Sequence, residues 1–150
     1  MRIAVAVLAS FVLMEIVSYA LHRWVMHGFG MAWHRSHHRP LATPHWERND
    51  RFPMVMATLA VILFAVGGGP QSTLFWCAVG VTAYGAAYVF VHDVYIHERL
   101  GFTPPRLRYL EWLRRRHGVH HDRGGEPYGM LLPWPRADSR DAMRARRPRL

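Results

Sequence analysis

Apolar residues are gathered in three segments of the chain, and polar segments separate them. Residues 3–21 carry a single charge, Glu15, and are long enough for a helix that crosses a bilayer. Residues 53–66 are also apolar, but this run is short for a span unless it is tilted or extended by the glycines that follow. Residues 73–91 carry no charge at all. The pattern predicts three membrane helices, the last two joined by an uncharged turn at residues 67–72.

This pattern predicts an all-α fold, an integral-membrane helical bundle with about three to four membrane helices. The number is open because residues 92–116 could add a partly inserted helix. We expect one membrane domain over residues 1–135 and a basic, disordered tail at residues 136–150, which are rich in arginine and poor in apolar residues. A cleaved signal peptide is the alternative for residues 3–21, but the length of the run and Glu15 disfavour it.

The composition fits a membrane protein better than a soluble domain. Hydrophobic residues make up 51% of the 150 positions, yet 19 basic residues, all arginine, stand against 10 acidic ones. The net charge of +9 would suit nucleic acid. However, the arginines flank apolar segments and histidine clusters, so a lipid membrane with anionic head groups is the simpler partner, and no nucleic acid is expected. The single cysteine, Cys77, lies in an apolar run and excludes a disulfide framework within the chain.

Ten of the eleven histidines form a two-part pattern that occurs twice. An H-x4-H pair is followed by an H-x2-H-H triplet, once before the predicted hairpin and once after it. The first unit comprises His22, His27, His34, His37 and His38, and the second comprises His92, His97, His117, His120 and His121. His45 fits neither motif, and we interpret it as a loop histidine. The duplicated spacing favours a metal site over scattered interfacial histidines.

The spacing within each motif predicts how its side chains are placed. The three histidines of an H-x2-H-H triplet share one helix face, so they can converge on a metal. The two histidines of an H-x4-H pair lie about 140° apart around a straight α-helix and cannot point at one spot. We therefore expect each pair to lie where a membrane helix ends or bends.

The histidine count favours iron over structural zinc. Imidazole binds zinc, copper, iron and nickel alike, but structural zinc takes about four ligands, often including cysteine. Ten motif histidines without a usable cysteine do not divide into such sites. Two six-coordinate ferrous ions would offer about twelve positions and leave about two for oxygen or water. One of the histidines could instead support a ligand from outside the metal shell.

Carboxylates near the motifs are expected to hold the histidines in place, because a metal-bound imidazole usually donates its other N–H to an oxygen. Asp93, next to His92, is the strongest candidate, with a solvated helix-end acid as the alternative. The nearby acids are Asp93, Glu98, Asp122, Glu111, Glu47 and Asp50.

Two features inside the predicted spans are weaker candidates. Glu15 is an ionisable residue in a membrane helix, which is unusual unless it is functional. It is about 10 Å of helix rise from His22, too far to touch the same metal, but it could bond a histidine or arginine of another helix. Tyr84 and Tyr88 align with His92 and could line a substrate channel, with interfacial aromatics as the alternative.

The arginines also predict an orientation. Residues 22–51 hold five arginines and residues 67–72 hold none, and arginine-rich loops remain in the cytoplasm. We expect the N-terminus outside the cell membrane and the hairpin tip on the same side. Every histidine cluster would then lie on the cytoplasmic side.

The residues around the histidines resemble those of bacterial β-carotene hydroxylases. The likeness runs from about residue 14 to residue 135. The histidine pattern alone is shared with the wider superfamily of fatty acid hydroxylases, sterol oxidases and desaturases. The residues that point to the carotenoid branch are those at 22–28 and 33–38, Asn49-Asp50, Thr82-Ala83-Tyr84-Gly85 before His92-Asp93, and those at 117–121. Glu126-Pro127-Tyr128-Gly129 departs from the family pattern, which leaves the preference for ring and substituent open.

The resemblance implies O2-dependent hydroxylation of β-ionone rings at C3, from β-carotene through β-cryptoxanthin to zeaxanthin. It implies a non-haem di-iron centre with two Fe2+ ions held by the ten motif histidines. It also implies that electrons come from ferredoxin or another NAD(P)H-fed donor. The carotenoid substrate would come from the bilayer. Arg114, Arg115 and Arg116 could dock an acidic donor, with membrane anchoring as the alternative.

Three alternative functions stay open at this point. One is a di-iron hydroxylase or desaturase of another membrane lipid, such as a fatty acid or a sterol. The second is a haem-binding membrane cytochrome, which would show a Soret band. The third is a non-catalytic metal-binding membrane protein, which would bind metal without oxygen-dependent turnover.

Overall fold

The computed structural model describes residues 1–38, 46–101 and 104–133. These residues form helices, turns and connecting segments, which confirms the predicted all-α fold. The predicted tail and His45 lie outside the described residues. In chain order the helices are α1 (Arg2–Ala20), η1 (Leu21–Phe29), α2 (Met31–His34), η2 (Arg48–Asp50), α3 (Arg51–Gly67), α4 (Thr73–Val89), η3 (Phe90–Ile96) and α5 (Arg108–Arg123).

Three helical segments are long and apolar enough to cross a membrane. They are Arg2–Phe29, Arg48–Gly67 and Thr73–Ile96. The short apolar run at residues 53–66 reaches span length because the helix begins earlier, at η2. The possible fourth membrane helix corresponds to α5, which is rich in arginine and histidine and is not among the three spans of the described residues.

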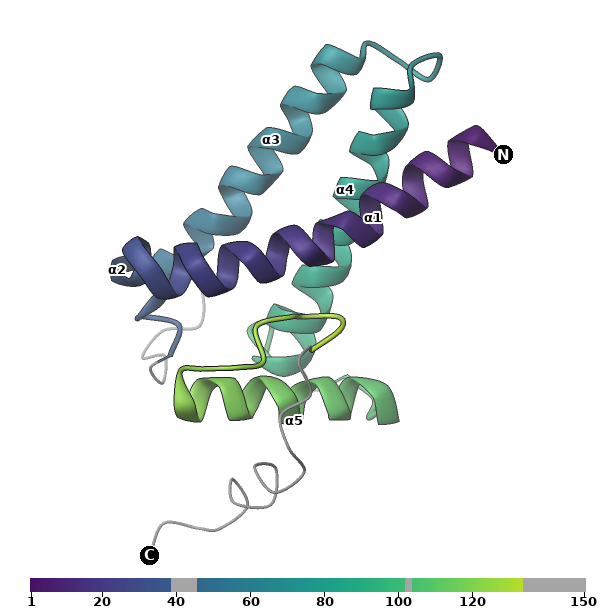
Figure 1. Cartoon of the computed structure of the whole chain (residues 1–150). Coiled ribbons are helices and arrows are strands. Elements are labelled where there is room, and N and C mark those ends of the chain that lie inside the picture. Colours follow the sequence, from purple (N-terminus) through teal and green to yellow (C-terminus); the bar gives the residue numbers. More distant parts are fainter. Residues whose placement is uncertain (39–45, 102–103, 134–150) are drawn as a thin grey trace, which may run out of the picture.

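Helix α4 packs against both α1 and α3, and α5 lies across one end of the three spans (Figure 1). Helices α3 and α4 form an antiparallel hairpin, and α1 crosses α4 obliquely (Figure 1). The N-terminus and the hairpin tip lie toward the same end, while α2 and α5 lie toward the other (Figure 1). All of the elements that carry the histidine motifs are therefore gathered at one end of the bundle.

A close helix contact holds α1 against α4. At Gly80 of α4, an added Cβ atom would overlap the Ser10 hydroxyl and the Val7 carbonyl oxygen of α1. The Ser10 hydroxyl donates to the Ala6 carbonyl at 2.7 Å, so it lies flat against its own helix. Small residues at a crossing let two membrane helices approach closely, and this contact sets the position of α1 over α4.

The first prediction concerns this crossing. Gly80→Ala should lower the stability of the protein in detergent by about 1–3 kcal/mol, because the added methyl group forces the two helices apart. Gly85→Ala in the same helix is the matched control, since nothing lies within 4 Å of its added Cβ. The melting temperatures of the two variants are measured by thermal unfolding, with circular dichroism as the signal. Equal melting temperatures for the two variants would contradict the close contact.

Candidate metal centre

Three of the four H-x4-H histidines lie on π-helical segments that continue the membrane helices, and His97 directly follows the second segment. His22 and His27 lie on η1, which follows α1, and His92 begins a turn of η3, which follows α4. The His97 N–H donates to the His92 carbonyl at 3.0 Å, an i→i+5 bond. Such bonds bring residues five positions apart to one face of the helix. In a regular α-helix the same two residues point in different directions. The rings of His22 and His27 lie 5.2 Å apart, and those of His92 and His97 lie 4.7 Å apart. The expected departure from straight helix is confirmed.

The first H-x2-H-H triplet does not converge on one point, although its spacing had suggested that it could. Helix α2 ends at His34, and the chain continues in turns through residue 38. His34 Nε2 lies 3.3 Å from His22 Nε2, whereas His37 Nε2 lies 2.9 Å from His92 Nε2. The His34 and His37 side chains therefore contact different sets of histidines.

The second triplet is divided in the same way along α5. His117 Nε2 lies 3.1 Å from His97 Nε2, and His120 Nε2 lies 3.1 Å from His27 Nε2. Residues three apart on a helix share a face but are displaced by about 4.5 Å along its axis. Side chains on one face of α5 thus reach two neighbouring points, which is the physical reason why one triplet contributes to both.

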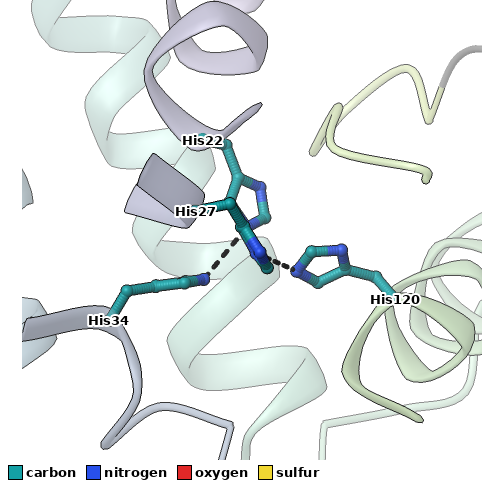
Figure 2. A group of neighbouring side chains, drawn as sticks. All are labelled: His22, His27, His34 and His120. Carbon is teal, nitrogen blue, oxygen red and sulfur yellow. Dashed lines mark hydrogen bonds between the residues drawn. The ribbon is translucent and has the colours of Figure 1, made fainter. Parts of the chain in front are cut away.

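Eight of the motif histidines form two compact groups, and each group mixes residues from both sequence units. Within each group the ligand nitrogens all lie within 4.8 Å of one another. Figure 2 shows the rings of the first group pointing from η1, the end of α2 and α5 toward a common centre. Group A comprises His22, His27, His34 and His120, and group B comprises His37, His92, His97 and His117.

The remaining two motif histidines complete the arrangement. His38 Nε2 lies 3.0 Å from His34 Nε2, so it adds a fifth imidazole to group A. His121 Nε2 lies 2.8 Å from His117 Nε2 and 3.2 Å from His37 Nε2, so it adds a fifth to group B. The rings of His38 and His121 stack on each other at 4.5 Å, where the two groups meet.

Oxygen atoms orient five of these rings through Nδ1. In group A the acceptors are neutral, and in group B they are carboxylates. The group A contacts are His22 to the Tyr128 carbonyl (2.9 Å), His34 to Asn49 Oδ1 (2.7 Å) and His120 to the Gly125 carbonyl (2.6 Å). The group B contacts are His37 to Glu47 Oε2 (3.3 Å) and His92 to Asp93 Oδ1 (3.0 Å).

These acceptors determine the tautomer of each ring. Because an oxygen acceptor requires a hydrogen on Nδ1, a neutral imidazole is left with a bare lone pair on Nε2. The facing Nε2 atoms of His22 and His34, and those of His37 and His92, then cannot hydrogen-bond each other. Lone pairs that converge in this way repel one another unless a cation lies between them. The donor set of both groups therefore fits metal ions.

The protonation of the histidines suits the same role. Burial lowers the pKa of His34 and of His120 to about 3. Burial also lowers the pKa of His97 to about 3 and that of His121 to about 2. These imidazoles are consequently neutral near pH 7, which is the form that binds a metal.

The carboxylates proposed from the sequence divide into two sets. Asp93 and Glu47 contact group B as described above, and Asp50 accepts both Arg99 NH groups at 2.7 Å. Two others form contacts away from the histidine groups. Glu98 pairs with Arg114 at 2.9 Å, and Glu111 accepts a hydrogen bond from the Tyr95 hydroxyl at 2.8 Å. Asp122 is exposed.

Sequence reasoning missed several groups that orient the histidines. The carbonyls of Gly125 and Tyr128 are backbone atoms, which no residue pattern reveals. Asn49 was noted only as part of the family resemblance, and its side chain proves to be the partner of His34. Arg99, which binds Asp50 and Asp93, follows His97 by two residues, and its position among the acids was the available signal.

Glu15 does not contact a motif histidine or an arginine in the described part of the chain. Its carboxylate accepts the Tyr84 hydroxyl at 2.7 Å and the backbone N–H groups of Met130 (3.0 Å), Leu131 (3.1 Å) and Leu132 (2.8 Å). It therefore fastens the segment after α5 onto α1. That segment carries the Tyr128 and Gly125 carbonyls, which orient His22 and His120. Glu15 therefore affects group A indirectly, by holding this segment in place.

A large apolar cavity lies between the membrane helices, beside the histidine groups. Its volume is about 1050 Å³, and residues of α1, η1, α3 and α4 line it. Tyr84 and Tyr88 are part of the lining, as the sequence had suggested. The Tyr88 ring stacks on that of His92 at 5.0 Å, which connects the cavity wall to group B.

The second prediction concerns the fastening by Glu15. Glu15→Gln should speed hydrogen exchange at the amides of residues 130–132 by about tenfold or more, because hydrogen bonds to a charged acceptor are the stronger ones. Tyr84→Phe is the matched control, since it leaves the carboxylate and its amide contacts in place. Mass spectrometry of the exchanged peptides gives the rates. Unchanged exchange in Glu15→Gln would show that the segment is held by other contacts.

The chain is similar to known proteins over most of its length. A model of the fatty acid hydroxylase family matches residues 7–138. The β-carotene hydroxylase of Paracoccus sp. (strain PC1) is 42% identical over 117 residues, which cover 77% of this chain and 72% of the relative. The β-carotene hydroxylase of Pantoea ananas is 36% identical over 148 residues, covering 95% of this chain and 84% of the relative.

A chloroplast relative is also similar. The β-carotene 3-hydroxylase of an Oncidium hybrid cultivar is 38% identical over 126 residues, covering 79% of this chain and 41% of the relative. No solved structure matches the chain.

Proposed function

The chain belongs to the fatty acid hydroxylase family, and from this premise we propose that it is a β-carotene 3-hydroxylase. The resemblance to bacterial β-carotene hydroxylases is confirmed by the family match together with the two bacterial relatives. In the proposed reaction one atom of O2 becomes a hydroxyl group at C3 of a β-ionone ring. The other leaves as water, with two electrons and two protons supplied from outside. Both rings of β-carotene would react in turn, through β-cryptoxanthin to zeaxanthin. Residues 1–135 would form the hydroxylase domain.

The observation that carries the proposal is the pair of five-histidine groups. We propose that group A and group B each hold one Fe2+ ion, with all ten motif histidines as ligands. Two six-coordinate ions would then keep about two positions for oxygen or water. Bound iron would supply the activation of O2 and the oxidation of an unactivated C–H bond. The chain supplies neutral imidazoles in fixed tautomers, held by Asn49, Glu47, Asp93 and two carbonyls.

The cavity supports an apolar substrate. A carotenoid is a long hydrocarbon, and it has no route through water. A cavity of about 1050 Å³ among the membrane helices can take a ring and part of the polyene directly from the bilayer. The apolar side chains that line it would exclude water from the reacting carbon. Tyr88, stacked on His92, would set how close the ring comes to the histidine groups.

The arrangement of the helices supports the proposed orientation. The motif-bearing elements lie at the end opposite the N-terminus and the hairpin tip (Figure 1). With the arginine-rich segment 22–51 in the cytoplasm, the histidine groups would face that compartment in the cell membrane. An electron donor such as ferredoxin could then reach them from the cytoplasm.

The three consecutive arginines 114–116 expose less positive charge to such a donor than their sequence suggested. Arg114 pairs with Glu98 and donates to the Tyr95 carbonyl, and Arg116 is only 7% exposed. Only Arg115 of the three therefore presents an exposed side chain to such a donor.

The third prediction tests the reaction and the substrate together. Bacteria that accumulate β-carotene should form β-cryptoxanthin and zeaxanthin when they express this chain, and His38→Ala should abolish both products. His45→Ala is the control, because His45 belongs to neither motif. Chromatography of the extracted pigments gives the result. Unchanged β-carotene, with iron-loaded protein present in the membranes, would direct the search to fatty acids or sterols. A Soret band would indicate haem instead.

The fourth prediction tests the cavity. Gly85 lines it, and an added Cβ there meets nothing within 4 Å, so a larger side chain can grow into the open space. Gly85→Leu should lower zeaxanthin formation by about tenfold while the iron content is unchanged, since a misplaced substrate reacts slowly. Gly85→Ala is the size control and should keep most of the activity. Full activity of Gly85→Leu would show that the substrate binds elsewhere.

A further inference from the structure

The acceptors around the two histidine groups differ in charge. Group A is oriented by two backbone carbonyls and the Asn49 amide, all of them neutral. Group B is oriented by two carboxylates, from Glu47 and Asp93. The ten imidazoles themselves are alike, so this difference in their surroundings is what distinguishes the two positions.

The negative charge beside group B is only partly balanced. Arg99 donates to both oxygens of Asp50 at 2.7 Å, to Asp93 at 3.1 Å, and its Nε lies 3.8 Å from Glu47 Oε1. One guanidinium thus faces three carboxylates, which leaves a net charge of about −2 when all are ionised. The Glu47 side chain is only 1% exposed, and its Oε1 accepts no hydrogen bond from any described residue. Glu47 is therefore a buried carboxylate that faces one guanidinium, which it shares with Asp50 and Asp93.

The carboxylates on the other side of the site do not contact the rings of group A. Glu126 pairs with Arg23 at 2.7 Å and accepts the Tyr19 hydroxyl at 2.9 Å, both through Oε1, while its Oε2 accepts no hydrogen bond from a described residue. Glu15 is occupied by Tyr84 and the amides of residues 130–132, as described above. Neither contacts an imidazole of group A among the described residues, so group A has no comparable charge at its rings.

We propose that the two metal positions are inequivalent, and that group B binds the first ion and holds it more tightly than group A. Glu47 and Asp93 would act as positioning residues that strengthen their imidazoles as ligands. A carboxylate on the far N–H raises the basicity of an imidazole, and its charge attracts a divalent ion in a buried site. Changing such a partner alters metal affinity by about 10–100-fold. The inference rests on the proposed function, because it requires that both groups bind metal.

The test is a metal titration of the full chain in lipid nanodiscs. Metal-free protein is titrated anaerobically with Co2+, whose visible absorption reports binding to imidazole nitrogen, in competition with a chelator. We expect two binding steps whose affinities differ by about tenfold or more. The tight step should be lost in His92→Ala, and the weak step should be lost in His34→Ala. Circular dichroism confirms that each variant keeps its helices.

Reciprocal variants assign the cause to the acceptors. Glu47→Gln and Asp93→Asn keep the shape of each side chain and remove its charge, so each should weaken the tight step by about tenfold or more. Asn49→Asp introduces a charge at the ring of His34 and should strengthen the weak step. Because this variant adds a carboxylate to group A and leaves group B intact, it decides the question even where a group B variant fails to fold.

The outcomes separate this inference from the proposed function. Absence of Co2+ binding would contradict the proposed metal centre itself. Two steps of equal affinity, or a tight step that is lost in His34→Ala, would overturn the inequivalence while the metal centre stands. A tight step that does not respond to Glu47→Gln or Asp93→Asn, with a weak step that does not respond to Asn49→Asp, would overturn the role of the charges.

Discussion

The structure depends on the convergence of ten imidazoles, six of them buried, at one end of the bundle. Oxygen acceptors hold the Nδ1 hydrogens of five of these rings outward, from η2, η3 and the segment after α5. Such an arrangement is unfavourable by itself and becomes favourable when cations occupy the two centres. The π-helical ends of two membrane helices, the break after α2 and the placement of α5 are all consistent with this one requirement.

The membrane gives the site its second requirement. In the proposed function, an electron donor in the aqueous phase must be able to reach the histidines, and an apolar substrate must be able to enter from the bilayer. The chain meets both by extending α1 and α4 beyond their apolar stretches into η1 and η3, which carry the histidine pairs. Tyr88 and His92 stack where the apolar cavity meets group B. The histidine groups thus lie beside a space that an apolar substrate could fill.

Much of this could be predicted from the sequence, because the signals are local. Hydropathy located three spans, and the H-x4-H spacing predicted a departure from straight α-helix at His22 and His92. The division of each triplet between two groups could not be predicted, since it depends on how α5 lies across the other helices. The contacts of Glu15 could not be predicted either, because its partners at Met130 to Leu132 are backbone amides more than a hundred residues away.

The central claim is that each chain holds two iron ions in nitrogen-rich sites built from both histidine units. The most direct measurement is iron quantification together with X-ray absorption on anaerobically reconstituted protein in nanodiscs. The account predicts two iron ions per chain, each with a shell dominated by imidazole nitrogen. One ion per chain, no ion, or a shell dominated by oxygen would contradict it.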